Sequence, residues 1–164
     1  ILTDRPIRVG GLYLPNGNPA PGQKYDYKME WMDALEQHAR ALLKQDEAFV
    51  LCGDYNCIPT PEDCWDETVW QDDALALPET RAEFRKLKYL GLADAFELTD
   101  GRAHQYTFWD YQGGAFKKDH GIRIDHLLCS PQACDRLQSV EIYRKARELE
   151  KPSDHVPVIG TFEA

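Results

Sequence analysis

A short apolar run at residues 48–54, AFVLCGD, limits how this chain can fold. Because the run has no polar alternation, it is typical of a strand buried on both faces of a sheet. Just before it, residues 25–45 place apolar side chains at helical spacing. These apolar residues are Met29, Met32, Leu35, Ala39, Leu42 and Leu43. A buried strand directly after an amphipathic helix predicts an α/β fold in which helices cover a sheet.

The rest of the chain continues this mixture of strands and helices. Residues 7–15 are rich in β-forming side chains and predict a strand, while residues 78–89 predict a second helix with proline in its first turn. We also expect a short buried segment within 91–100, a strand that leads into a loop over 106–121, a strand over 122–130, another that begins near residue 139, and a last one at 156–162. Residues 1–164 are therefore expected to form a single domain of layered sheets and helices.

Bulk composition is ordinary for a soluble globular protein, with 43% hydrophobic and 29% charged residues. No apolar stretch reaches the about 20 residues that a membrane span requires. A basic segment followed by an apolar run, as in a signal peptide, is also absent from the sequence. We therefore expect a cytoplasmic location and no membrane partner.

The cysteine pattern argues against a disulfide framework and against a zinc cluster. The number of cysteines is odd, and none of them forms a C-x-x-C pair. They are Cys52, Cys57, Cys64, Cys129 and Cys134. Reduced thiols are the expectation.

The formal net charge of −9 argues against general binding of polyanions, which depends on clustered lysine and arginine. It does not exclude a nuclease. Carboxylates gathered at a metal site make a chain acidic, and the bound cation reverses the local field.

Polar residues with catalytic potential stand at the ends of the predicted strands. They are Asp54, Asn56, Asp125 and Asp154, and His155 directly follows the last of them. Any one of these alone is more simply explained as a turn or as a surface ion pair. Together they offer oxygen ligands of the kind that Mg²⁺ prefers, and an imidazole that titrates near neutral pH. They suit zinc poorly.

Several sequence blocks resemble a known superfamily. "GDYN" (53–56), "RIDHLL" (123–128) and "SDHVP" (153–157) are similar to the signature blocks of the exonuclease/endonuclease/phosphatase superfamily. Other blocks resemble one branch of this superfamily, exonuclease III. They are "LYLPNGNP" (12–19), "KYDYKMEWM" (24–32), "IPTPEDCWD" (58–66) and "YTFWDYQGGAFKKDHGIRIDHLL" (106–128). Members of that branch cleave DNA at abasic sites and remove nucleotides from 3′ ends. The resemblance implies a DNase I-like four-layer fold, with two β-sheets packed face to face and helices outside.

The resemblance also implies roles for individual residues. Asp54 would orient or deprotonate the attacking water, and Asn56 would hydrogen-bond a phosphate oxygen. His155 would contact the phosphate and stabilise developing charge, with Asp125 orienting its ring. Tyr13 would face the phosphate.

A divalent cation is implied in the same way. The resemblance indicates Mg²⁺, with Mn²⁺ as a possible substitute, held by Asp54, Asn56 and Asp154. The family's principal metal ligand is a glutamate in an N-terminal portion that we do not find in this sequence. We therefore expect residues 1–164 to be the C-terminal portion of the fold, to expose a sheet edge, and to be weakly active or inactive alone.

The aromatic block is expected to bind the substrate. From composition alone, Phe108 and Trp109 would be core residues. By resemblance they join Ile122 in walling a small apolar pocket for a flipped-out abasic sugar, in double-stranded DNA with abasic sites or 3′ ends. Arg123 would contact phosphate, as would Lys117 and Lys118. Since His126 follows Asp125 on a strand, its side chain should face the other way, as a packed or surface histidine.

Two other functions remain open at this point. One is a superfamily phosphoesterase with a different substrate, such as an inositol phosphate or a sphingolipid. The other is a fragment without catalytic activity that binds DNA or a partner chain. The oligomeric state is not predicted.

Overall fold

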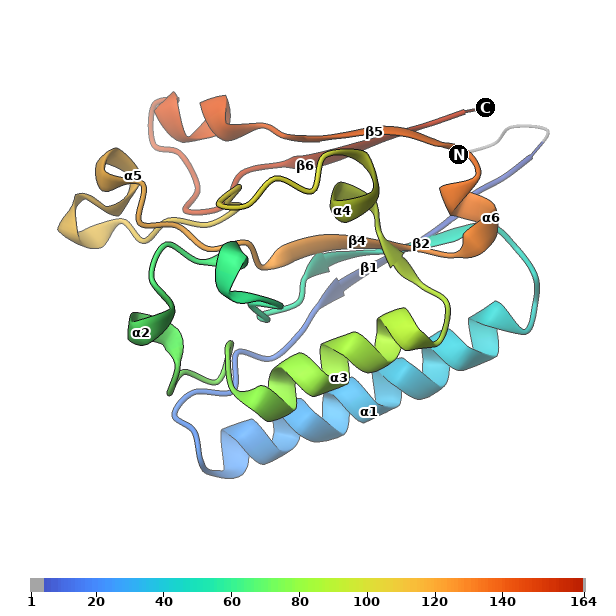
Figure 1. Cartoon of the computed structure of the whole chain (residues 1–164), viewed down its shortest axis with the longest axis horizontal. Coiled ribbons are helices and arrows are strands. Elements are labelled where there is room, and N and C mark those ends of the chain that lie inside the picture. The colour runs from blue at the N-terminus through green and yellow to red at the C-terminus, as the bar shows by residue number, and fades with distance from the viewer. Residues whose placement is uncertain (1–4, 164) are drawn as a thin grey trace.

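A four-stranded sheet forms the centre of the molecule, which is represented by a computed structural model that describes residues 5–163 (Figure 1). Its strands lie in the order β1-β2-β4-β3. β1 and β2 are parallel, whereas β4 is antiparallel to both β2 and β3. The strands are β1 (Arg8–Tyr13), β2 (Phe49–Asp54), β3 (Ala93–Asp94) and β4 (Asp125–Cys129).

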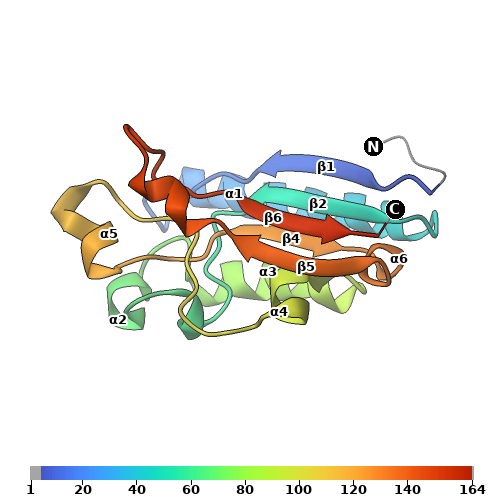
Figure 2. The ribbon, with the colours of Figure 1, turned by 90° about the horizontal axis from the view of Figure 1, so that it is seen from above.

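Helices cover one face of this sheet and a second sheet covers the other. α1 (Gln23–Leu43) and α3 (Pro78–Tyr89) lie side by side below it in Figure 1. The antiparallel pair β5 (Leu137–Ile142) and β6 (Val158–Phe162) lies above it, as Figure 2 also shows. The predicted layered α/β fold is confirmed. The described residues account for three layers: a helix layer, the four-stranded sheet and the two-stranded sheet.

The apolar run in β2 is explained by these layers. Phe49 and Leu51 pack with Met32 and Leu35 of α1, whereas Val50 contributes to the core between the two sheets. Because alternate side chains of a strand face opposite sides, a strand between two apolar layers must be apolar throughout. Burying each large side chain contributes about 1.5–3 kcal/mol.

Short elements fill the remaining length. They are α2 (Glu67–Trp70), α4 (Ala95–Thr99), α5 (Ala115–Lys118), α6 (Pro131–Cys134) and the 3₁₀ turns η1 (Pro61–Asp63), η2 (Gln112–Gly114) and η3 (Arg144–Glu148). The five cysteines are free, as predicted. Across residues 5–163, we find no helix with the length and apolar character needed to cross a membrane.

The strand predicted within residues 106–121 is wrong. Phe108 makes only isolated bridges, to Ile122 and to His155, and the segment then turns through η2 and α5. Gly113 and Gly114 adopt φ of 62° and 68°, which interrupts an extended backbone. Tyr106 and Trp109 are therefore buried by a folded loop and not by a sheet.

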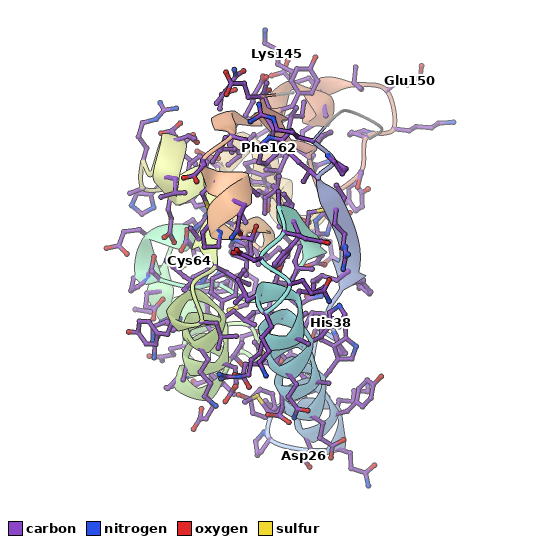
Figure 3. The ribbon with its side chains drawn as sticks, turned by 90° about the vertical axis from the view of Figure 1, so that its right-hand side faces the viewer. Asp26, His38, Cys64, Lys145, Glu150 and Phe162 are labelled. Carbon is purple, nitrogen blue, oxygen red and sulfur yellow. The ribbon has the colours of Figure 1, made fainter. Side chains whose placement is uncertain are left out.

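β1 forms an edge of the central sheet, since its partner among residues 5–163 is β2 alone. In Figure 3, which looks along the strands, β1 lies at the right of the sheet, with His38 of α1 below it. A groove of about 300 Å³ separates the strand from the helix, and Gly10, Leu12 and Trp31 line it together with His38. The expected exposed edge is present in the structure.

Arg123 does not lie where a phosphate contact was predicted. Its side chain is 3% exposed and donates to Asp63 Oδ1 and to Asp94 Oδ2, both at 2.6 Å. The guanidinium also stacks over Phe96, 5.1 Å from the ring centroid. His126 is buried beside it, with Nδ1 3.2 Å from Asp94 Oδ2, so the packed-histidine prediction is confirmed. Arg123 ties η1 to β3 and is not available to bind a substrate.

Burial alone would raise the pKa of Asp94, but Arg123 and His126 outweigh it and hold that pKa well below the ordinary value. Asp94 therefore contributes stability above the ordinary aspartate pKa of about 4, and this contribution is lost as pH falls further. We predict that Asp94→Asn destabilises the protein by about 3–5 kcal/mol at pH 7, because it leaves a buried arginine short of a counter-charge. Urea unfolding at pH 7 measures the loss.

The matched control is Asp100→Asn, which removes an exposed carboxylate that pairs with Arg102 on the surface. It should change stability little, because exposed ion pairs contribute little. Equal losses from the two substitutions would contradict the account.

Candidate active site

The ends of three strands lie together at one end of the central sheet, on its left-hand side in Figure 1. Tyr13 and Asp54 are the last residues of the parallel strands β1 and β2 and lie opposite one another. Because β4 runs antiparallel, its first residue, Asp125, pairs with Asp54. Strand register therefore aligns a tyrosine and two carboxylates across one edge.

Gly53 allows β2 to end in this way. Its φ is 146°, and a Cβ atom there would lie 1.9 Å from the carbonyl oxygen of Leu12. Any side chain would clash with the backbone of β1. The glycine of the GDYN motif is thus required for the close pairing that places Asp54 at the edge.

Asp54 and Asn56 form one hydrogen-bonded turn. Asp54 Oδ1 accepts from the Asn56 backbone N–H at 2.7 Å, and Asn56 Nδ2 donates to Leu14 O at 2.8 Å and to Asp54 Oδ2 at 3.2 Å. Asn16 Nδ2 donates to Asn56 Oδ1 at 3.2 Å. The Asx turn that the spacing allowed is present, and it also holds the candidate catalytic carboxylate in place. Since the Asn56 amide is engaged within the protein, its contact with phosphate stays a prediction.

The environment of Asp54 raises the pKa of its carboxyl group to about 6. Burial is the main cause, and the Asp125 carboxylate adds to it, while the Asn56 N–H and His155 partly offset the rise. A carboxylate that titrates close to neutral pH can accept a proton from water more readily than an ordinary aspartate.

His155 forms a pair with Asp125. Its Nδ1 lies 2.9 Å from Asp125 Oδ2, and this hydrogen bond is the main reason that the pKa of His155 is raised, although burial opposes it. With Nδ1 engaged, Nε2 is the ring nitrogen that can contact a ligand. The pair therefore presents an oriented imidazole that favours its protonated form.

The loop before β6 is fixed by a buried arginine. Arg147 donates to Ser153 O at 3.0 Å and to Trp109 O at 3.1 Å. Trp109 N in turn donates to Asp154 O at 3.0 Å. These bonds hold the turn that leads into His155 against the aromatic block.

These residues enclose a cleft of about 290 Å³. It brings together seven predicted site residues: Tyr13, Asp54, Asn56, Phe108, Ile122, Asp154 and His155. Asp125 lies behind His155 and supports it. Its lining has two parts. Leu75, Phe108, Ile122 and Ile124 form an apolar wall, and the polar side chains, Asp54, Asn56 and Asp154 among them, form what we call the polar floor.

Trp109 does not line the cleft as predicted. Its side chain is fully buried, its indole N–H donates to Asp119 Oδ1 at 3.0 Å, and its ring packs edge-on against Phe116. The neighbouring Phe108 faces the cleft and lies 5.0 Å from His155 between ring centroids. Trp109 belongs to a different buried cluster, with Tyr106 and Val156. Lys117 and Lys118 are exposed on α5, and their contact with phosphate stays a prediction.

Sequence reasoning missed several cleft residues. Asn16, Asn18, Asp73, Trp70 and Asp110 all line it. The polar "PNGNP" loop directly after the first strand was a usable signal for the two asparagines. We find no comparable signal for the others: Trp70 reaches the cleft from the end of α2, and Asp73 and Asp110 reach it from loops.

The predicted metal ligands do not form a metal centre by themselves. Within residues 5–163, no group of three or more His, Cys, Asp or Glu side chains is placed to hold a cation. Both carboxylate oxygens of Asp54 already accept hydrogen bonds from Asn56, and Asp154 accepts from Ser153. Asp54, Asn56 and Asp154 are thus an incomplete set of metal ligands among residues 5–163.

Comparison with known proteins agrees with this geometry. The model of the Endonuclease/Exonuclease/phosphatase family matches residues 1–155. The chain belongs to this family. It is 30% identical over 179 residues to exodeoxyribonuclease III of Haemophilus influenzae, an alignment that covers 99% of this chain and 66% of that protein. The resemblance to exonuclease III is therefore confirmed.

Solved structures of this family have the same fold. An AP endonuclease from Archaeoglobus fulgidus superposes with a TM-score of 0.91 at 30% identity, and the Neisseria 3′ phosphatase NExo, bound to product DNA hairpin, with a TM-score of 0.92 at 34% identity. Each match covers 96% of this chain and 62% of the other. The chain thus spans just under two thirds of the length of these relatives.

We predict that Gly53→Ala lowers the free energy of unfolding by more than about 1 kcal/mol, because alanine is strained at positive φ and its Cβ meets Leu12. Thermal and urea unfolding measure it. Gly11→Ala is the control, since a Cβ on Gly11 in the adjacent strand would meet nothing within 4 Å. The close-pairing account fails if Gly53→Ala is as stable as Gly11→Ala.

A second prediction concerns the pair at the cleft. Asp125→Asn removes the negative charge that stabilises the imidazolium, so the pKa of His155 should fall toward or below its ordinary value of about 6.5. NMR titration of the imidazole protons measures this. Asp110→Asn, which removes another cleft carboxylate, should leave that pKa nearly unchanged. An unchanged His155 pKa in Asp125→Asn would rule out the pairing.

Proposed function

We propose that this chain carries the phosphodiester-hydrolysing residues of a DNA-repair nuclease that cleaves DNA at abasic sites and removes nucleotides from 3′ ends. The observation that carries the proposal is the single cleft that joins the Asp54 carboxylate to the Asp125–His155 pair. The family membership and the names of the relatives support it.

The reaction needs an activated water and a means of stabilising charge on the phosphate. In the proposed mechanism, Asp54 takes a proton from water as the water oxygen bonds to phosphorus. The phosphorus–oxygen bond to the leaving nucleotide then breaks, and the leaving oxygen takes a proton from solvent water. Protonated His155, held by Asp125, donates a hydrogen bond to the phosphate oxygen on which charge develops. Tyr13, which is 72% exposed at the rim of the cleft, donates a hydrogen bond from its hydroxyl group to the phosphate.

The cleft wall favours an abasic sugar. Phe108 and Ile122 form an apolar surface beside the polar floor, together with Leu75 and Ile124. A nucleotide without its base costs less to extrude from a duplex, and a bare sugar can lie against such a surface. This wall is the reason for preferring an abasic DNA substrate over a soluble phosphate ester.

We further propose that activity depends on Mg²⁺, which Mn²⁺ can replace. Asp54 and Asp154 would supply oxygen ligands, and further ligands would come from substrate phosphate, from water or from outside residues 5–163. Because the described set is incomplete, residues 1–164 alone should be weakly active. We place the protein in the cytoplasm, where it would act on double-stranded DNA.

The test is incision of a duplex that carries one synthetic abasic site, with and without Mg²⁺. It compares this chain with the full-length gene product that contains it. His155→Ala should lower the rate in the more active form by on the order of 100-fold or more, because an oriented acid or donor is lost. His104→Ala, which alters an exposed histidine outside the cleft, should leave the rate unchanged.

Two results would overturn the proposal. One is incision by neither form in the presence of Mg²⁺. The other is incision that His155→Ala leaves intact. In either case, hydrolysis of soluble phosphate esters and simple duplex binding would be measured next, as the phosphoesterase and binding-fragment alternatives require.

A further inference from the structure

Helix α1 carries a fully buried lysine beneath the cleft. The side chain of Lys28 is 0% exposed, among apolar residues of the same helix such as Met32 and Leu35. Lysine is almost never fully buried unless its ammonium group is paired. The partners of this group therefore indicate what it does.

Both hydrogen-bond partners of Lys28 are backbone carbonyls of cleft loops. Its Nζ donates to Asn56 O at 2.5 Å and to Asn16 O at 3.0 Å. These two loops follow β2 and β1, and they are also joined through the Asn16–Asn56 side-chain hydrogen bond. The ammonium group thus links, from below, the same two loops that the amides link at the cleft.

The loop after β1 is shaped around this side chain. Gly17 has a φ of 91°, and a Cβ atom there would lie 2.6 Å from Lys28 Cδ. The stem of the lysine occupies the space that a side chain on the loop would need. This packing contact does not depend on the hydrogen bonds, and it also places Lys28 against the loop that follows β1.

The charge of Lys28 also suits the cleft. Burial lowers the pKa of Lys28 to about 8, and the negative charges of Asp73 and Asp54 act in the opposite direction. The ammonium form therefore remains the main one at neutral pH. It brings a positive charge beneath a floor that holds several carboxylates.

We propose that Lys28 is a positioning residue for the hydrolytic site, an inference that rests on the proposed function. It fixes the Asn56 and Asn16 loops through their carbonyls. Asn56 in turn donates its backbone N–H to Asp54 Oδ1, so the lysine sets the orientation of the carboxylate that activates water. Lys28 itself touches neither substrate nor water in this role.

The activity test compares Lys28→Met, which keeps the stem but removes the donors, with Lys28→Arg, which keeps charge and donors. Since a displacement of about 1 Å at a catalytic group costs on the order of 100-fold, Lys28→Met should lower kcat on the abasic duplex to that extent. KM should change little, because duplex binding does not depend on this lysine. Lys28→Arg should recover part of kcat. Lys24→Met, at an exposed position one turn earlier on α1, is the matched control.

A second readout does not depend on activity. In ¹⁵N-labelled protein, Lys28→Met should shift or broaden the backbone and side-chain amide signals of Asn16 and Asn56, while signals from β5 and β6 stay in place. If no form of the unsubstituted protein incises DNA in the presence of Mg²⁺, the proposed function fails, and these signals still decide whether Lys28 positions the loops.

Three results would overturn the proposal. The first is unchanged Asn16 and Asn56 signals in Lys28→Met. The second is a kcat equal to that of Lys24→Met. The third is loss of the β5 and β6 signals in both Lys28→Met and Lys28→Arg, which would assign the lysine to folding and not to positioning.

Discussion

The pairing of β2 with β1 on one side and with β4 on the other is the constraint on which the site depends. It brings Tyr13, Asp54 and Asp125 to one edge of the sheet. The pairing requires glycine at position 53, since a side chain there would meet the backbone of β1. Apolar layers on both faces bury the strand, since Phe49 and Leu51 pack on the helix side and Val50 packs toward the second sheet. The packing of the fold and the geometry of the cleft therefore have one origin.

The charges around this end of the sheet give Asp54 and His155 different roles in proton transfer. Burial and the neighbouring carboxylate raise the pKa of Asp54, while Asp125 stabilises the protonated form of His155. The first group is suited to accept a proton and the second to donate a hydrogen bond to an anion. Away from the cleft, Arg123 forms buried ion pairs with Asp63 and Asp94 and thereby joins η1 to β3. The charged residues of the cleft are thus suited to chemistry, whereas the ion pairs of Arg123 stabilise the fold.

The sequence allowed the main features to be predicted, because they are local. The apolar run of β2, the helix before it and the polar residues at strand ends are all visible in short windows. The predicted substrate contacts of Arg123 and Trp109 were wrong. The sequence does not distinguish an arginine that pairs with a buried aspartate from one that binds phosphate, or a buried tryptophan from one that lines a cleft. The contribution of Lys28 could not be predicted either, since it depends on how two distant loops approach each other.

The measurement that tests the central claim most directly is the single-turnover rate of abasic-site incision by Asp54→Asn, in the form of the protein that is active. Asparagine keeps the size of the side chain but cannot accept a proton from water. The account predicts a loss on the order of 100-fold to 10,000-fold, with duplex binding retained. Incision at the unsubstituted rate would contradict it, because the carboxylate at the end of β2 would then have no part in the chemistry.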